Sequence, residues 1–277
     1  MVCGQSAVEN LVVKNMNFSD EIRKIVIKNS KVAGVGHIGS ALSIADLIGV
    51  LYQDAIIIDD PKNPERDRFV LSKGHAVLAL YAALFLKGLL SREELDSYCV
   101  DGTRIAVHPK HFVPGIEFTT GSLGQGITFA TGAALAAKIQ KSNRKIYCLI
   151  SDAELDEGSF WEAILFAAHH KLNNLCIILD LNGQQALGFT DQVINISDVA
   201  QKIKTFGFFV EEIDGHDQEK IRITLKKFTE QKIDQPTFIS AKTISGKGVS
   251  FMEKSIPWHY KSMNEQEYQQ AMQELNA

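Results

Sequence analysis

Oxygen-bearing groups follow two predicted strands of this chain and could bind a hard metal ion. Asp152 comes after the predicted strand 145–150, and Asn182 and the backbone carbonyl of Gln184 come after the predicted strand 175–179. Both predicted strands are almost entirely apolar. Such runs are typical of parallel strands that are covered on both faces. Because a parallel crossover brings successive carboxyl ends to one edge of the sheet, we expect the three groups to lie close together.

Three oxygens are too few for a closed magnesium cage. They are the set expected if the phosphates of a ligand and a water complete the octahedron. Taken singly, the residues have simpler interpretations: Asp152 would cap the following helix, and Asn182 would turn the chain. Their spacing taken together favours the metal site.

The segment 119–126, Thr-Thr-Gly-Ser-Leu-Gly-Gln-Gly, is a candidate phosphate-binding loop before a predicted apolar helix at 127–139. Its glycines would let backbone N–H groups approach an anion at the helix start. It is not a Walker A loop, because Ile127 and Thr128 follow the last glycine. For the loop taken alone, a tight turn against a neighbouring strand is an equally good explanation.

A second glycine cluster, 34–39, matches the dinucleotide-binding pattern G-x-G-x-x-G letter for letter. That pattern requires a strand before it and a helix after it. Residues 19–31 instead predict a capped helix that starts at Ser19 and Asp20, although the run Ile25–Ile27 leaves a strand open. NAD binding is therefore disfavoured.

Alternating strand and helix patterns predict the fold. Beyond the elements above, strands are expected at 208–210 and 237–240 and helices at 159–170, 218–231 and 264–275. This rhythm is typical of an α/β fold with a doubly wound, mostly parallel sheet and helices on both faces. We expect one domain over 1–277, with an N-terminal arm at 1–18 and a C-terminal extension at 260–277. The polar helix within that extension would lie on the surface or on a partner.

The composition excludes several function classes. The 277 residues carry a net charge of −4, which offers no basic field to a nucleic acid. The apolar run 76–86 has eleven residues, against the ~18 that a membrane span needs. No export signal is expected at the start, and the cysteines lack the spacing of a zinc site or a disulfide framework. A cytoplasmic protein that binds neither nucleic acid nor membrane is therefore expected.

Several short blocks occur in a fixed order along the chain. They are Gly36–Gly39, Leu71–Ala76, the loop 119–126, Asp152–Gly158 with Trp161–Ala163, Asp180–Asn182, and Gly246–Gly248 leading to Trp258 and His259. From about residue 22 to 259 the chain thereby resembles the N-terminal, diphosphate-binding portion of transketolase. Each block alone is weakly specific, whereas their order and spacing are highly specific.

The resemblance implies roles for the matching residues. Asp152, Asn182 and the carbonyl of Gln184 would bind Mg²⁺, or Ca²⁺ or Mn²⁺, which holds the phosphates of thiamine diphosphate. His37, His108 and His259 would line the substrate channel, hydrogen-bond the sugar and help to move protons. The implied cofactor-binding residues are Ser40, His75, Gly121, Ser122, Leu123, Asp152, Ala153, Glu157, Asn182 and Lys247. Judged from the residues alone, a histidine is more often structural than catalytic.

The implied activity is that of a transketolase-type transferase (EC 2.2.1.-), which moves a two-carbon ketol unit from a ketose to an aldose. A full transketolase continues beyond Ala277 into a pyrimidine-binding and a C-terminal domain. We therefore expect the N-terminal subunit of a split enzyme, active only with a C-terminal partner, as an α2β2 heterotetramer. The alternatives are a chain that uses a modified sugar or an α-keto acid, and a cofactor-binding chain without turnover.

The chain departs from the family pattern beside the expected metal. Ser151 and Ala153 replace the glycines of the usual Gly-Asp-Gly, and Ile38 replaces a proline. A methyl group at Ala153 would lie where a phosphate passes, and it would be strained if that position is left-handed.

Overall fold

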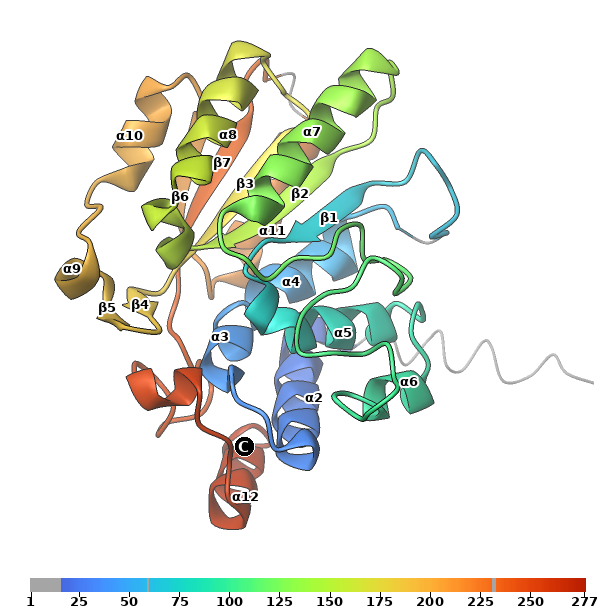
Figure 1. Cartoon of the computed structure of the whole chain (residues 1–277), viewed down its shortest axis with the longest axis vertical. Coiled ribbons are helices and arrows are strands. Elements are labelled where there is room, and N and C mark those ends of the chain that lie inside the picture. Colours follow the sequence, from blue (N-terminus) through green and yellow to red (C-terminus); the bar gives the residue numbers. More distant parts are fainter. Residues whose placement is uncertain (1–15, 59, 231–232) are drawn as a thin grey trace, which may run out of the picture.

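Five parallel strands form the central sheet of the described chain, which comprises residues 16–58, 60–230 and 233–277 of a computed structural model (Figure 1). In spatial order they are β1 (Arg68–Leu71), β2 (Ile146–Ser151), β3 (Leu175–Leu181), β7 (Thr237–Lys242) and β6 (Phe209–Asp214). The sequence pattern indicates all of these strands except β1, which is short and lies at one edge. All neighbouring strands pair in parallel, so the expected sheet is confirmed.

Alternate residues of each inner strand face two separate cores. In β2, Cys148 and Ile150 pack into one core, whereas Tyr147 and Leu149 pack into the other. The two-residue period of a strand produces this division. Because both faces are buried, the strands appear in the sequence as continuous apolar runs.

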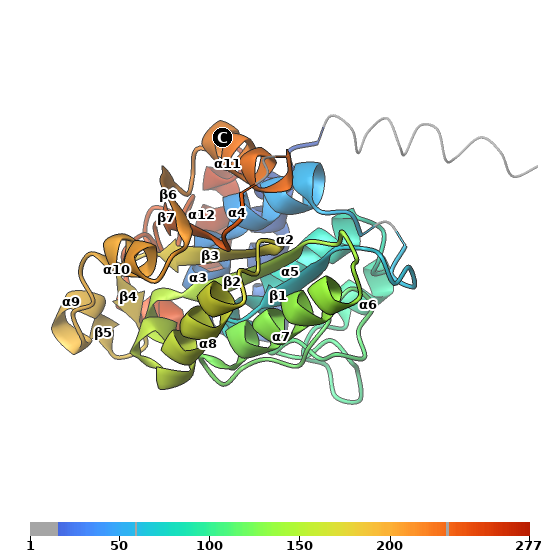
Figure 2. The same cartoon turned by 90° about the horizontal axis from the view of Figure 1, so that it is seen from above.

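Helices cover both faces of the sheet (Figure 2). One core is closed by α7 (Gln125–Ile139), α8 (Gly158–His169) and α10 (Val199–Thr205). The other core is closed by α2 (Phe18–Ala33), α4 (Ala45–Val50), α5 (Val77–Leu86) and α11 (Gln218–Glu230). The loops carry α3 (Ile38–Ser43), α6 (Arg92–Asp96), β4 (Gln184–Gln185), β5 (Gly188–Phe189) and α9 (Thr190–Val193). No helix in the described ranges combines the length and the apolarity needed to cross a membrane.

A helix precedes the glycine cluster 34–39, so the strand left open at Ile25–Ile27 is wrong. The N-terminus of α2 is capped by Asn17, whose side chain accepts the N–H of Ser19 at 2.9 Å. The helix ends at Gly34, which has a φ of 66°. Without a strand before it, the cluster does not form a dinucleotide-binding turn.

The C-terminal helix α12 (Glu265–Glu274) packs on α2 of the same chain. Ala271 is fully buried, and Lys31 of α2 pairs with Glu265 at 3.4 Å. Of the expected arm 1–18, residues 1–15 lie outside the described ranges, and Phe18 already belongs to α2.

Candidate active site

Two loops at the carboxyl edge of the sheet are joined through Asp152. Ser151 and Asp180 are register partners at the ends of β2 and β3. One carboxylate oxygen of Asp152 accepts the N–H of Gly183 at 2.7 Å, and the other accepts the N–H of Ala153 at 3.0 Å. Asp152 therefore touches the loop that carries Asn182.

Asp152 does not cap the element that follows it. Ser151 and Glu154 form the capping box of the short helix η3 (Asp152–Asp156). Burial and the neighbouring Asp180 raise the pKa of the Asp152 carboxyl to about 7. Within the described part of the chain, no cationic side chain forms an ion pair with this carboxyl. Because an isolated buried carboxylate is costly, the position favours a bound cation.

The amide of Asn182 is oriented by Asp180. Its Nδ2 donates to Asp180 at 2.9 Å, and its Oδ1 accepts the N–H of Gln184 at 2.9 Å. Asn182 thus turns the chain and also keeps its oxygen on the side of Gln184. The Nε2 atom of Gln184 is buried without a hydrogen-bond partner. An orphaned polar atom here is expected if a ligand completes the site.

A buried ion pair supports this edge of the sheet, and the sequence pattern does not indicate it. Lys73 and Asp180 are both almost completely buried, and the Lys73 ammonium pairs with the Asp180 carboxylate. Ser43 donates to the same carboxylate at 2.6 Å, and Thr243 donates to its other oxygen. Burial alone would raise the pKa of Asp180, but Lys73 and these donors hold it below its ordinary value. The charge of Lys73 is thus compensated within the chain.

Three histidine rings meet beside these loops. The ring centroids of His37, His75 and His259 lie 5.4, 5.3 and 5.2 Å apart. The backbone N–H of His37 donates to the carbonyl of His259 at 3.0 Å, which joins the segment before α3 to the C-terminal region. Burial lowers the pKa of all three, that of His259 to about 4. The rings are therefore neutral near pH 7, and each can donate and accept a hydrogen bond.

Tyr260 covers two of these rings and is a further residue that the sequence did not single out. Its ring centroid lies 5.6 Å from that of His37 and 4.8 Å from that of His259. A Cβ at Gly36 would collide with the carbonyl of Tyr260, so this close approach requires glycine. The side chain is 64% exposed and forms an aromatic rim. An aromatic residue next to His259 is too common a signal to identify it from sequence.

Asp152, Asn182 and the three histidines all line one cavity of about 420 Å³. The predicted site residues that line it are His37, Ser40, His75, Gly121, Leu123, Asp152, Ala153, Glu157, Asn182, Gln184 and His259. Ser122, His108 and Lys247 are not part of the lining. A Cβ on Gly121 would lie 3.0 Å from the ring of His108, which therefore stands directly behind that loop. Lys247 pairs with Glu253 at 3.7 Å.

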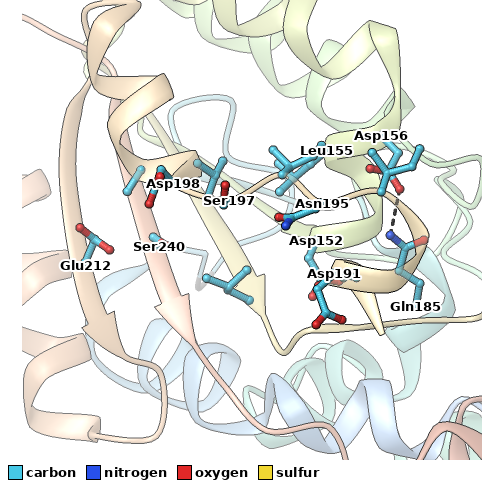
Figure 3. Close-up of a pocket in the computed structure, with 16 residues that line it drawn as sticks. Asp152, Leu155, Asp156, Gln185, Asp191, Asn195, Ser197, Asp198, Glu212 and Ser240 are labelled. Atoms are coloured by element: carbon cyan, nitrogen blue, oxygen red, sulfur yellow. Dashed lines mark hydrogen bonds between the residues drawn. The ribbon is translucent and has the colours of Figure 1, made fainter. Parts of the chain in front are cut away.

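Figure 3 shows a second pocket. Its volume is about 290 Å³, and it shares lining residues with the first. Asp152, Asp156 and Gln185 line both pockets, and Gln185 donates to Asp156 at 2.8 Å. The second pocket also presents Asp191 and Asp198, but no histidine lines it. The three neighbouring histidines thus line the larger of these two cavities and not the smaller one.

The two residues that replace the family's glycines adopt ordinary backbone conformations. Ser151 is extended, with a φ of −97°. Ala153 is not among the non-glycine residues of the described chain that have a positive φ. The strain considered for a left-handed Ala153 is therefore absent.

Comparisons with known proteins agree on one family. Residues 14–276 match the family model of the transketolase, thiamine diphosphate binding domain. The chain is 38% identical to one of the subunits of apulose-4-phosphate transketolase from Phocaeicola vulgatus, over 93% of this chain and 92% of the relative. It is 39% identical to a 6-deoxy-6-sulfo-D-fructose transketolase subunit of a Clostridium species, over 92% of this chain and 93% of that subunit.

Full-length transketolases match over a smaller share of their own length. Human transketolase is 39% identical over 93% of this chain but 41% of its own length. The crystal structure of transketolase from Campylobacter jejuni superposes with a TM-score of 0.87 at 33% identity, over 96% of this chain and 43% of the other. The chain thus spans less than half the length of these relatives. It belongs to the transketolase family of transferases, in which it corresponds to the thiamine diphosphate-binding domain.

Proposed function

We propose that this chain is the N-terminal subunit of a two-chain transketolase that transfers a two-carbon ketol unit from a ketose to an aldose. The observation that carries the proposal is the buried carboxylate of Asp152. It forms no ion pair within the described chain, it is joined to the Asn182 loop, and it lines the cavity that three neutral histidines share. A cation-tethered cofactor beside proton-transferring groups fits this combination.

The donor set fits a hard divalent ion. Asp152, Asn182 and the carbonyl of Gln184 would hold Mg²⁺, or Ca²⁺ or Mn²⁺, and the ion would offset the charge of a carboxylate whose pKa burial raises to about 7. Phosphate oxygens of thiamine diphosphate would complete the coordination. When bound, the cofactor supplies the carbon nucleophile and the electron sink of ketol transfer. Gly121 and Leu123 line the cavity wall that would face it.

The histidines would act on the sugar. His37 and His259 are neutral and face the cavity, so each can hydrogen-bond a hydroxyl or carbonyl oxygen and hold or release a proton. His75 is more deeply buried, and its strongly lowered pKa keeps it uncharged beside the cofactor. We propose the same role for His108, which lies behind Gly121 and does not itself line the cavity.

The partner follows from the named relatives. Two relatives that match this chain over nearly their whole length are called transketolase subunits. We therefore infer a second chain that supplies the pyrimidine-binding and C-terminal domains, in an α2β2 heterotetramer, with Glu157 near the subunit contact. We also infer a cytoplasmic enzyme that binds neither nucleic acid nor membrane, in keeping with its net charge of −4.

A modified sugar is the second candidate substrate. The relatives' names specify apulose 4-phosphate and 6-deoxy-6-sulfo-D-fructose. The names of these relatives support the candidate. The aromatic rim at Tyr260, beside His37 and His259, would contact the part of either kind of sugar that lies outside the transferred unit.

The test has two stages. Calorimetry of the purified chain with thiamine diphosphate, with and without Mg²⁺, is expected to show metal-dependent binding. The chain is then co-expressed with a partner chain that resembles the remainder of transketolase. This pair is expected to give ketol transfer, assayed with apulose 4-phosphate, 6-deoxy-6-sulfo-D-fructose and an unmodified ketose phosphate. Full turnover by the isolated chain would refute the two-chain proposal. Absence of cofactor binding even with the partner present would refute the transketolase function.

A further inference from the structure

Glu154 is a completely buried carboxylate near the candidate active site, with 0% exposure, and none of the roles above uses it beyond its capping box. One of its oxygens accepts the backbone N–H of Gly124 at 3.0 Å and the hydroxyl of Ser72. The other oxygen accepts the backbone N–H of Ser151 at 2.9 Å. A single side chain thus connects three segments that are far apart in the sequence.

Each of these segments carries groups that line the cavity. Ser72 immediately precedes Lys73 and His75, Gly124 ends the loop of Gly121 and Leu123, and Ser151 precedes Asp152 and Ala153. The segments follow β1, precede α7 and end β2, respectively. The positions of these three segments relative to one another therefore depend on the hydrogen bonds that Glu154 accepts.

The donors around Glu154 require an acceptor at both oxygens. The N–H groups of Gly124 and Ser151 cannot reverse their polarity, and they point at different oxygens of the carboxylate. A glutamine of the same shape would place its NH₂ group against one of these two N–H groups. A buried donor would then lose its acceptor, and the segment that carries it would move.

We propose that Glu154 is a positioning residue, which clamps the segments 71–75, 119–126 and 150–153 into the arrangement that receives the diphosphate of the cofactor. The inference rests on the proposed function for the identity of the ligand. The clamp itself is a property of the ligand-free chain, so an experiment can contradict the clamp without contradicting the proposed function, and the reverse.

Asp67 provides a matched control. It is also buried, and its carboxylate accepts the backbone N–H groups of Ile57 at 3.0 Å and Lys145 at 2.7 Å. It precedes β1 and therefore lies at the opposite edge of the sheet from the cavity. Asp67→Asn creates the same kind of donor conflict away from the candidate active site.

The experiment compares E154Q with D67N by hydrogen–deuterium exchange of the ligand-free chain and by calorimetric titration with thiamine diphosphate at saturating Mg²⁺. E154Q is expected to accelerate exchange in all three clamped segments and to weaken binding at least about tenfold, as loss of an outer partner of a metal site does. D67N is expected to accelerate exchange around 57 and 145 and to change binding less than about threefold.

Exchange in E154Q that stays at the wild-type level in the three segments would overturn the clamp, whether or not the wild-type chain binds the cofactor. If the wild-type chain binds only with the partner present, the binding of all variants is compared in that complex. A wild-type chain that fails to bind even with the partner present refutes the proposed function instead. Equal weakening of binding by E154Q and D67N would also overturn the positioning role, because it would indicate a general loss of stability. If E154Q does not fold, Ser72→Ala is tested in its place, since it deletes one donor and leaves both backbone bonds. Unchanged exchange and unchanged binding in that variant would overturn the inference.

Discussion

Asp46 and Asp152 are buried to the same degree, each 3% exposed, yet the pKa of one carboxyl is lowered and that of the other is raised. Asp46 lies in α4, where it pairs with Arg23 and accepts hydrogen bonds from His216 at 2.8 Å and Gln218 at 3.0 Å. Burial would raise its pKa, but these partners lower it to about 2. Asp152 has only backbone donors, and its pKa is raised to about 7.

The ion-pair and hydrogen-bond partners of a buried carboxylate, and not its burial, decide whether its pKa is lowered or raised. Around Asp46 the chain supplies its own cation and donors, so the group links α2, α4 and the start of α11 and leaves nothing for a ligand. His216 is also fixed, since its other ring nitrogen accepts the N–H of Ile244 at 2.9 Å. Around Asp152 the described chain supplies no ion pair: Lys73 lowers the pKa of this carboxyl only in part, because its ammonium pairs with Asp180. A buried carboxylate in this setting favours a bound cation. The contrast separates a structural charge cluster from a candidate metal site.

Removal of the Asp46 carboxylate should have the largest effect. Asp46→Asn leaves the buried guanidinium of Arg23 with only the exposed Asp20, at 3.6 Å, as a counter-charge, so the free energy of unfolding should fall by about 3–5 kcal/mol. Denaturant unfolding at pH 7 measures this. The control is Asp54→Asn, which breaks a more exposed pair with Arg222 and should cost no more than about 1 kcal/mol. Equal losses in both variants would remove the distinction.

Asp152→Asn should affect stability less than Asp46→Asn does, and it should strongly weaken the metal-dependent binding of the cofactor. The free energy of unfolding of the ligand-free chain should fall by about 1–3 kcal/mol, less than in Asp46→Asn, because no internal ion pair is lost but the new NH₂ group faces the N–H of Gly183 or of Ala153. Metal-dependent binding of thiamine diphosphate should weaken at least about 100-fold, beyond the 10–100-fold of an outer partner. Calorimetry with Mg²⁺ measures the binding, and wild-type affinity in the variant would contradict the metal site.

The pH dependence of stability sharpens the contrast at Asp46. Its folded-state pKa of about 2 lies below its ordinary value of 3.8, so its contribution is complete above pH 4 and is lost as the pH falls toward 2. The loss should be about 2 kcal/mol. Unfolding of the wild type and of Asp46→Asn between pH 5 and pH 2 is the measurement. The difference between the two should shrink toward low pH, and a constant difference would contradict the lowered pKa.

Ala153→Gly should have the smallest effect. Because Ala153 does not have a positive φ, glycine gains nothing in the folded state and makes the unfolded chain more flexible. Stability should fall by about 0.5–1 kcal/mol, measured as a lower Tm, and cofactor affinity should change less than about threefold. A large gain in affinity would mean that the methyl group obstructs the phosphates.

Much of the fold and part of the candidate site could be predicted from local sequence. The runs that became β2 and β3 are continuous and apolar, and polar residues follow directly at Asp152 and Asn182. Parallel topology then requires these ends to meet, because a crossover connection returns the chain to the same edge. The helix predicted before the glycine cluster 34–39 is confirmed, although the run Ile25–Ile27 leaves a strand open when the sequence is considered alone.

Only the tertiary structure decided which charges and donors meet. Lys73 pairs with Asp180 across 107 positions, and Glu154 reaches Ser72 across 82. No local period encodes such pairs, because they form only when the sheet brings its carboxyl-end loops together. The sequence by itself determined the strands, the order of the loops and the residue types at their ends. Packing determined that Asp46 forms an ion pair and that Asp152, among the described residues, forms none, because the compensation of a buried charge depends on neighbours that are distant along the chain.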